Sequence, residues 1–117
     1  MVHSPRPKYC YVLDGHDAIT SVSPAWLAFA RENGAQELTA QAVLGHSLWN
    51  FIQGAETVRL YQAILRRVRS NSSRVVVPFR CDSPTLRRHM RLEISSQPLG
   101  CVQFISVLQR VKAISRW

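Results

Sequence analysis

The last third of the chain consists of three strand-like segments in close succession. They are Arg74–Cys81, Leu86–Ser95 and Cys101–Val111, and each gap between them contains a proline. The middle segment alternates apolar and polar residues, which is the two-residue period of a strand with one buried face. Strands joined by such short connections pair antiparallel. Any fold of this chain therefore has to place its earlier residues against an antiparallel sheet.

The parity of these segments predicts which side chains point inward. One face of the first segment carries Val75, Val77, Phe79 and Cys81. In the second segment the inward set is Leu86, Met90, Leu92 and Ile94, and the outward set is Arg87, His89, Arg91 and Glu93. The third segment is apolar at both parities, so it is expected to lie centrally or to have its second face covered.

The first half of the chain combines strands and helices. Tyr9–Leu13 and Ala18–Val22 have strand patterns joined by a turn. A helix begins at Ser23-Pro24, where serine caps free amides and proline fits the first helical position. Leu38–Gly54 holds short helical pieces, and a longer helix covers Glu56–Ser70. The order predicts an α+β domain, with a five-stranded antiparallel sheet and with short helices and one longer helix packed on one face.

Length and composition are those of one globular domain. With 117 residues, of which 46% are hydrophobic and 19% charged, the chain is expected to build a single core. We expect residues 9–112 to form the domain, with tails at 1–8 and 113–117. No apolar run reaches the roughly 20 residues of a membrane span. Cys10, Cys81 and Cys101 are widely spaced and suit reduced thiols, so a cytoplasmic protein is expected.

Basic residues are concentrated in the second half of the chain. Residues 1–58 hold three basic and five acidic residues, whereas residues 59–117 hold twelve basic and two acidic ones. Such a half can attract nucleic acid, a membrane surface or an acidic protein, and it can equally be a solvated face. Nucleic acid is not favoured, because the sequence has neither an aromatic RNA-binding motif nor a recognition helix.

Motifs for catalysis are missing from the sequence. It has no G-x-S-x-G nucleophile elbow and neither of the two glycine-rich phosphate loops. No spacing links a cysteine to a histidine as a nucleophile and its base. We therefore predict that the protein is not an enzyme, and a small enzyme is the least favoured alternative.

Several local patterns, taken in order, resemble the PAS domain family. They are Asp14…Ile19-x-x-Val22-Ser-Pro24 before an aromatic helix, the segment Val43–Ile52, and a Tyr61-containing helix ahead of three strands. The resemblance covers about Tyr9 to Lys112, and it departs from many PAS sequences in having Pro24 where they have asparagine. It implies a small-molecule sensor or protein-interaction module in signal transduction, which acts through a separate output protein.

PAS domains can hold haem, flavin, small carboxylates or other metabolites between sheet and helices, or hold nothing. A haem-binding PAS domain commonly places its histidine ligand in the helix that corresponds to Glu56–Ser70, which has no histidine here. Photosensing flavin members carry an Asn-Cys-Arg-Phe run before that helix, and this sequence lacks it. The resemblance therefore leaves the cofactor unknown.

Candidate ligand-binding residues follow from the inward parities and the resemblance. A pocket between sheet and helices is expected to be lined by Trp26, Phe29, Trp49, Tyr61, Phe79, Arg88, Met90 and Phe104. Arg88 shares the inward parity of Met90, and a buried guanidinium is costly unless it is paired. It can reach water from near the start of the strand, or it can bind a carboxylate of Glu56 or of an anionic ligand.

A homodimer through the outer face of the sheet is also expected. The apolar residues Ile105 and Val107 are not needed to face the helices. The resemblance implies that the first and last strands are neighbours, which assigns the dimer interface to Tyr9, Tyr11, Ile105 and Val107. An uncovered apolar strip usually marks an interface, and two-fold pairing is the commonest way to bury it. The alternative is a different, acidic partner, which the outward Arg87, His89 and Arg91 would suit.

Overall fold

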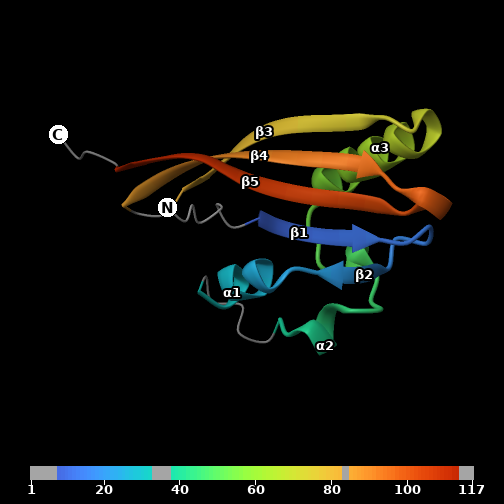
Figure 1. Cartoon of the computed structure of the whole chain (residues 1–117), viewed down its shortest axis with the longest axis horizontal. Helices are drawn as coiled ribbons and strands as arrows, with labels where there is room; N and C mark the ends of the chain where they lie inside the picture. Colours follow the sequence, from blue (N-terminus) through green and yellow to red (C-terminus); the bar gives the residue numbers. More distant parts are fainter. Residues whose placement is uncertain (1–7, 33–37, 83–84, 114–117) are drawn as a thin grey trace, which may run out of the picture.

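The computed structural model describes residues 8–32, 38–82 and 85–113. They form a five-stranded antiparallel sheet, a helix of 17 residues and several short helices (Figure 1). The predicted α+β fold class is therefore confirmed. The tails predicted at 1–8 and 113–117 lie outside the described residues, except for Lys8 and Ala113, which belong to strands.

The first and last strands of the chain meet in the middle of the sheet. β1 (Lys8–Leu13) pairs antiparallel with β2 (Ile19–Val22) on one side and with β5 (Val102–Ala113) on the other. β3 (Arg74–Asp82) and β4 (Leu86–Ser96) complete the sheet, in the order β2-β1-β5-β4-β3. The central position of β5 agrees with the apolar residues at both of its parities.

The registers confirm the inward parities of β3 and β4. Phe79 lies opposite Met90, and Met90 lies opposite Leu108, so these three side chains share one face of the sheet. The register between β4 and β5 shifts between His89, which lies opposite Arg110, and Met90, which lies opposite Leu108. The connection from β4 to β5 contains the short helix η2 (Pro98–Gly100).

Four helices lie between β2 and β3 in the described residues. They are α1 (Pro24–Glu32), α2 (Ala40–Val43), η1 (Leu48–Asn50) and α3 (Ala55–Asn71). The first three each begin after a serine or threonine whose hydroxyl caps the helix. At α1 the predicted Ser23 cap accepts a hydrogen bond from the Trp26 amide at 3.2 Å. None of the helices in the described part of the chain has both the length and the apolar character of a membrane span.

The helices cover one face of the sheet, here called the inner face. α3 contacts β3, β4 and β5, and α1 contacts β1. In Figure 1, α3 lies behind β3 and β4, so the view is onto the opposite face, here called the outer face. The core lies on the inner face and consists of Leu13, Ile19, Val43, Leu48, Leu65, Val68, Ile94, Val102 and Phe104.

Phe104 is the largest of these fully buried side chains. Its ring stacks with that of Tyr11 at a centroid distance of 4.6 Å and with that of Tyr61 at 6.1 Å. The three rings come from β5, β1 and α3, so this aromatic layer joins the two central strands to the longest helix. Such contacts contribute beyond the area that they bury.

The pairing of β1 corrects the predicted dimer residues. Tyr9 lies opposite Ser106 and Tyr11 opposite Phe104, which places both tyrosines on the inner face. Tyr9 packs there against Phe29 of α1, at a ring distance of 5.1 Å. Ile105 and Val107 do lie on the outer face, but the β1 residues opposite them are Cys10 and Lys8. The prediction was wrong because both parities of β1 are apolar, so its pattern does not indicate a face.

Replacing Phe104 with alanine should lower the free energy of unfolding by about 3–5 kcal/mol, because the change leaves a cavity in the aromatic layer. Leu60→Ala is the matched control, since Leu60 is 56% exposed. That change should cost no more than about 0.5 kcal/mol. Urea denaturation measures both values, and equal small losses would contradict the position of the core.

Candidate functional site

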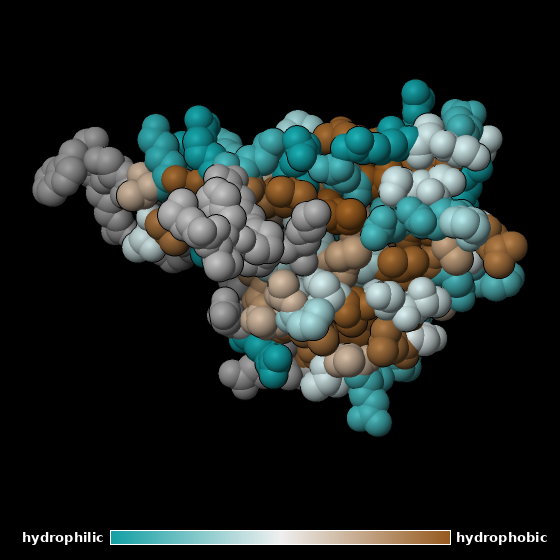
Figure 2. Space-filling model, in the orientation of Figure 1, coloured by the Kyte–Doolittle hydropathy of each residue, from teal (hydrophilic) through white to brown (hydrophobic). Residues whose placement is uncertain are grey.

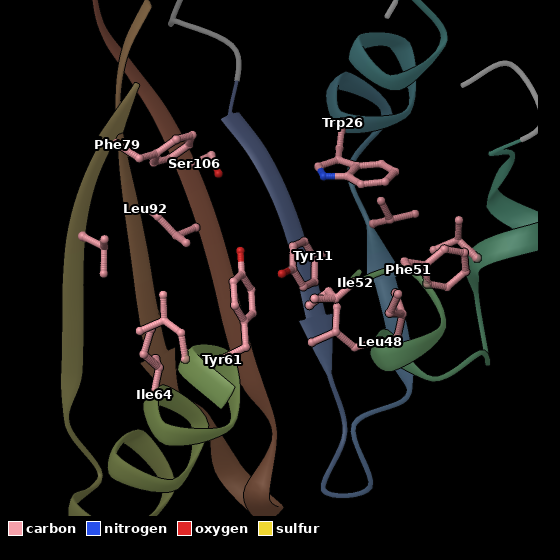
Figure 3. Close-up of a pocket in the computed structure, with 15 residues that line it drawn as sticks. Tyr11, Trp26, Leu48, Phe51, Ile52, Tyr61, Ile64, Phe79, Leu92 and Ser106 are labelled. Atoms are coloured by element: carbon pink, nitrogen blue, oxygen red, sulfur yellow. The ribbon is translucent and has the colours of Figure 1, made fainter. Parts of the chain in front are cut away.

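A cavity of about 430 Å³ lies between the inner face and the helices, here called the inner pocket (Figure 3). The sheet contributes Tyr11, Ile19, Val22, Val77, Phe79, Leu92 and Ser106. The helices and their connections contribute Trp26, Val43, Leu48, Phe51, Ile52, Leu60, Tyr61 and Ile64. The volume falls within the range of typical small-molecule sites.

The pocket exists because the inner face of β5 changes from large to small residues. Val102 and Phe104 fill the core completely, and neither has exposed surface. The next inward residue is Ser106, which lies opposite Tyr9 on β1 and Leu92 on β4. A serine at this position fills much less volume than the phenylalanine before it, and the residual space forms the pocket.

The polar side-chain groups of the pocket wall are three hydroxyls and the indole N–H of Trp26, and no charged residue lines it. The hydroxyls belong to Tyr11, Tyr61 and Ser106. In Figure 3 the Tyr11 hydroxyl is directed towards Tyr61, and the Tyr61 hydroxyl points along the sheet towards Ser106. Within the described residues these three hydroxyls have no hydrogen-bond partner. Each is thus able to donate to, or accept from, a bound molecule.

Burial keeps both phenols protonated. It raises the pKa of Tyr11 above its ordinary value of 10.0, and the neighbouring Tyr61 raises it further. The pKa of Tyr61 is raised as well, again by burial. Loss of hydration disfavours the phenolate. At neutral pH the pocket therefore presents uncharged hydroxyl donors to any occupant.

The pocket opens to solvent past three large apolar side chains. Leu60 of α3, Phe79 of β3 and Phe51 after η1 are 56%, 39% and 36% exposed. Leu60 belongs to α3 and Phe51 directly follows η1, whereas Phe79 belongs to the sheet. The opening therefore lies between helices and sheet, where a ligand can enter without unfolding the core.

The structure brings together some of the predicted ligand residues and not others. Trp26, Tyr61 and Phe79 line the inner pocket. Phe104 lies in the core and contacts the pocket only through the rings of Tyr11 and Tyr61. The others do not line it, and they are Phe29, Trp49, Arg88 and Met90.

Arg88 lies outside the pocket because of its position along β4. It pairs with Val111, two residues beyond Met90 in the direction away from the core, and its side chain is half-buried. Glu56, the predicted intramolecular partner, is exposed at the start of α3. The expected guanidinium fork for an anionic ligand is therefore not part of this pocket.

Tyr11 and Ser106 are the residues that sequence reasoning missed. Ser106 follows Val102 and Phe104 at the inward parity of β5, so a polar residue on that face was visible in the pattern. Tyr11 was not assignable from its own strand, because only the pairing with β5 shows which way it points. The apolar lining residues of the two short helices gave no periodic signal.

A second cluster, here called the Arg69 clamp, holds two loops to α3. The Arg69 guanidinium forms an ion pair with Asp17 at 2.7 Å and donates to the Asp14 carbonyl at 2.8 Å. It also donates to the Gly100 carbonyl in η2 at 3.0 Å. One side chain thereby connects α3 with the β1–β2 turn and the β4–β5 turn.

Trp49 extends the clamp to η1. Its indole Nε1 donates to the other carboxylate oxygen of Asp17 at 3.0 Å. The turn itself is ordered by Asp14, whose carboxylate accepts from the amides of His16 and Ala18. These hydrogen bonds lower the pKa of Asp14. Since η1 and the residues beside it line the inner pocket, the clamp positions part of the pocket wall from outside.

Comparison of the chain with protein-family models, with curated proteins and with solved structures finds no match. Among the described residues, no three side chains of His, Cys, Asp or Glu come together in a way that could hold a metal ion.

Arg69→Lys should lower the free energy of unfolding by about 1–2 kcal/mol. The compact ammonium group of lysine cannot donate to all three acceptors that the planar guanidinium reaches at once. Arg67→Lys on the same helix is the matched control, since Arg67 is exposed, and it should leave stability nearly unchanged. Thermal or urea unfolding measures both. Equal effects of the two changes would show that the clamp contributes nothing specific.

Proposed function

We propose that this chain is a sensor module that binds a small, uncharged and mostly apolar molecule in the inner pocket. Its occupancy is communicated to a separate output protein. The observation that carries the proposal is an apolar cavity with three hydroxyls that lack partners within the described residues. A ligand that accepts their hydrogen bonds gains both burial and satisfied polar groups.

The chemistry of the wall favours an uncharged ligand. A carboxylate or phosphate in this cavity would lose its hydration without meeting a lining cation. Burial of an unpaired charge is far more costly than burial of an amide or a hydroxyl. A molecule with one carbonyl or ether oxygen and a flat or branched hydrocarbon body fits the hydroxyls and the aromatic wall.

The resemblance to PAS domains supports the same proposal. It implies helices between the second and third strands and a first strand beside the last, and this chain has both features. It also implies that ligands lie between sheet and helices, where the inner pocket is found. The proposed sensor function rests on these features together with the sequence patterns around Asp14, Val43 and Tyr61.

Occupancy has a physical route to the rest of the domain. Tyr61 and Ile64 of α3 line the pocket, and Arg69 of the same helix forms the clamp to both turns. A ligand that contacts both helix and sheet favours one relative position of the two. Its binding would thereby alter the clamped turns, which are at the surface and accessible to a partner.

Nile red, a flat and uncharged dye with a carbonyl oxygen, is a suitable probe. Its fluorescence should rise and shift to the blue with saturation at one dye per chain. Ser106→Phe should abolish this binding because the new ring fills the cavity. Tyr61→Phe keeps the ring but removes one donor, and should weaken binding about two- to tenfold, as expected for one neutral hydrogen bond.

Ser95→Phe is the matched control. Ser95 lies on β4 at the outer parity, opposite Gln103, so its replacement adds the same ring to the other side of the sheet. Nile red should bind this variant as it binds the parent. Unsaturable binding, or equal loss in the two serine variants, would contradict the proposed ligand site.

A further inference from the structure

The outer face of the sheet combines an apolar strip with a basic end. The strip consists of Cys10 and Val12 of β1 and Ile105 and Val107 of β5, which face away from the helices and are half-buried. In the register Gln103 lies opposite Val12 and Lys8 lies opposite Val107, so polar residues border both ends of the strip. Figure 2, which has the orientation of Figure 1, shows hydrophobic atoms along the middle of this face and hydrophilic atoms over β3 and β4. A contiguous apolar strip beside charged residues is typical of a docking surface.

The basic end lies next to the strip and consists of Arg87, His89, Arg91, Arg110 and Lys112. The register brings these residues together, since Arg87 pairs with Lys112 and His89 pairs with Arg110. Nη2 of Arg110 lies 3.4 Å from Nε2 of His89, and since a guanidinium can only donate, the imidazole accepts in this contact. Arg87 and Lys112 are like charges on directly opposed strand positions and repel one another, so this end gains from an anionic partner.

Carboxylates are scarce around this surface. Glu93 is held by Arg74 and by Arg91, and those two ion pairs lower its pKa against the effect of burial. Over residues 74–113 the sequence has seven basic residues and two acidic ones. Within the described residues, Nε of Arg87 is buried without a hydrogen-bond partner. The register places Asp82 opposite Arg87, and the described outer-face positions of β3, β4 and β5 still hold more basic residues than carboxylates.

We infer that the outer face docks an acidic segment of another protein, with the partner's apolar side chains on the strip and its carboxylates on the basic end. Charge complementarity selects this occupant. A second copy of the chain would bring the same basic face and no surplus of carboxylates. Nucleic acid would leave the apolar strip unused, and the described outer-face residues include no Phe, Tyr or Trp ring on which a base could stack.

This inference is independent of the inner pocket, because the two surfaces lie on opposite faces of the sheet. The probe is a fluorescein-labelled helical peptide with leucine along one face and glutamate elsewhere. A matched peptide carries glutamine for glutamate, and a labelled single-stranded DNA oligonucleotide tests the nucleic-acid alternative. Fluorescence anisotropy with the intact chain gives each affinity.

The acidic peptide should bind, and the glutamine peptide should bind at least about tenfold more weakly. Arg110→Glu with Lys112→Glu should reduce the affinity for the acidic peptide by a similar factor. Arg59→Glu with Arg66→Glu changes net charge equally through exposed residues of α3, and should have less than about a twofold effect. Ile105→Thr with Val107→Thr keeps strand propensity and should also reduce binding.

Four results would overturn the inference. Absence of peptide binding, or equal loss in both charge-reversal variants, means that no acidic segment docks on this face. Tighter binding of the oligonucleotide, unaffected by the threonine variant, assigns the face to nucleic acid. A dimer in sedimentation that the threonine variant dissociates assigns it to a second copy. Ser106→Phe should leave the affinity for the acidic peptide unchanged, so a failure of the pocket proposal can be distinguished from a failure of this inference. Circular dichroism verifies that each variant is folded.

Discussion

The antiparallel pairing of β1 with β5 is the interaction on which the rest of the structure depends. It joins segments separated by about ninety residues, and it fixes the face on which each of their side chains lies. Tyr11 beside Phe104 forms the aromatic layer of the core. Ile105 beside Cys10 forms the outer strip. A shift by one residue would exchange these two sets completely.

Core and pocket are consecutive stretches of the same inner face. Phe104 packs without exposed surface, and two residues later Ser106 leaves space that the helices do not fill. The phenols of Tyr11 and Tyr61 border both regions, with rings on Phe104 and hydroxyls toward the cavity. The rigid stack thereby orients the polar groups that a ligand would meet, which reduces the entropy lost on binding.

The sequence predicts the fold class and most element positions, because β3, β4 and α3 have clear periodicities. It does not predict the face of β1, since Tyr9–Leu13 is apolar at both parities. Nor does it predict the Arg69 clamp. Arg69 lies 55 residues from Asp14 and 31 from Gly100, and an arginine off the apolar stripe of a helix is ordinarily a solvated one. Arg88 was wrongly predicted to line the pocket, because the parity of a strand residue indicates its face of the sheet but not whether its position along the strand is near the pocket.

The most direct test of the ligand site is a methyl NMR spectrum of isoleucine-labelled chain, recorded with and without Nile red. Ile19, Ile52 and Ile64 line the inner pocket, whereas Ile105 lies on the outer face. Shifts confined to the three pocket methyls are the predicted result. A shift of Ile105 with unchanged pocket methyls would place the ligand on the wrong side of the sheet and contradict the inner pocket as the binding site.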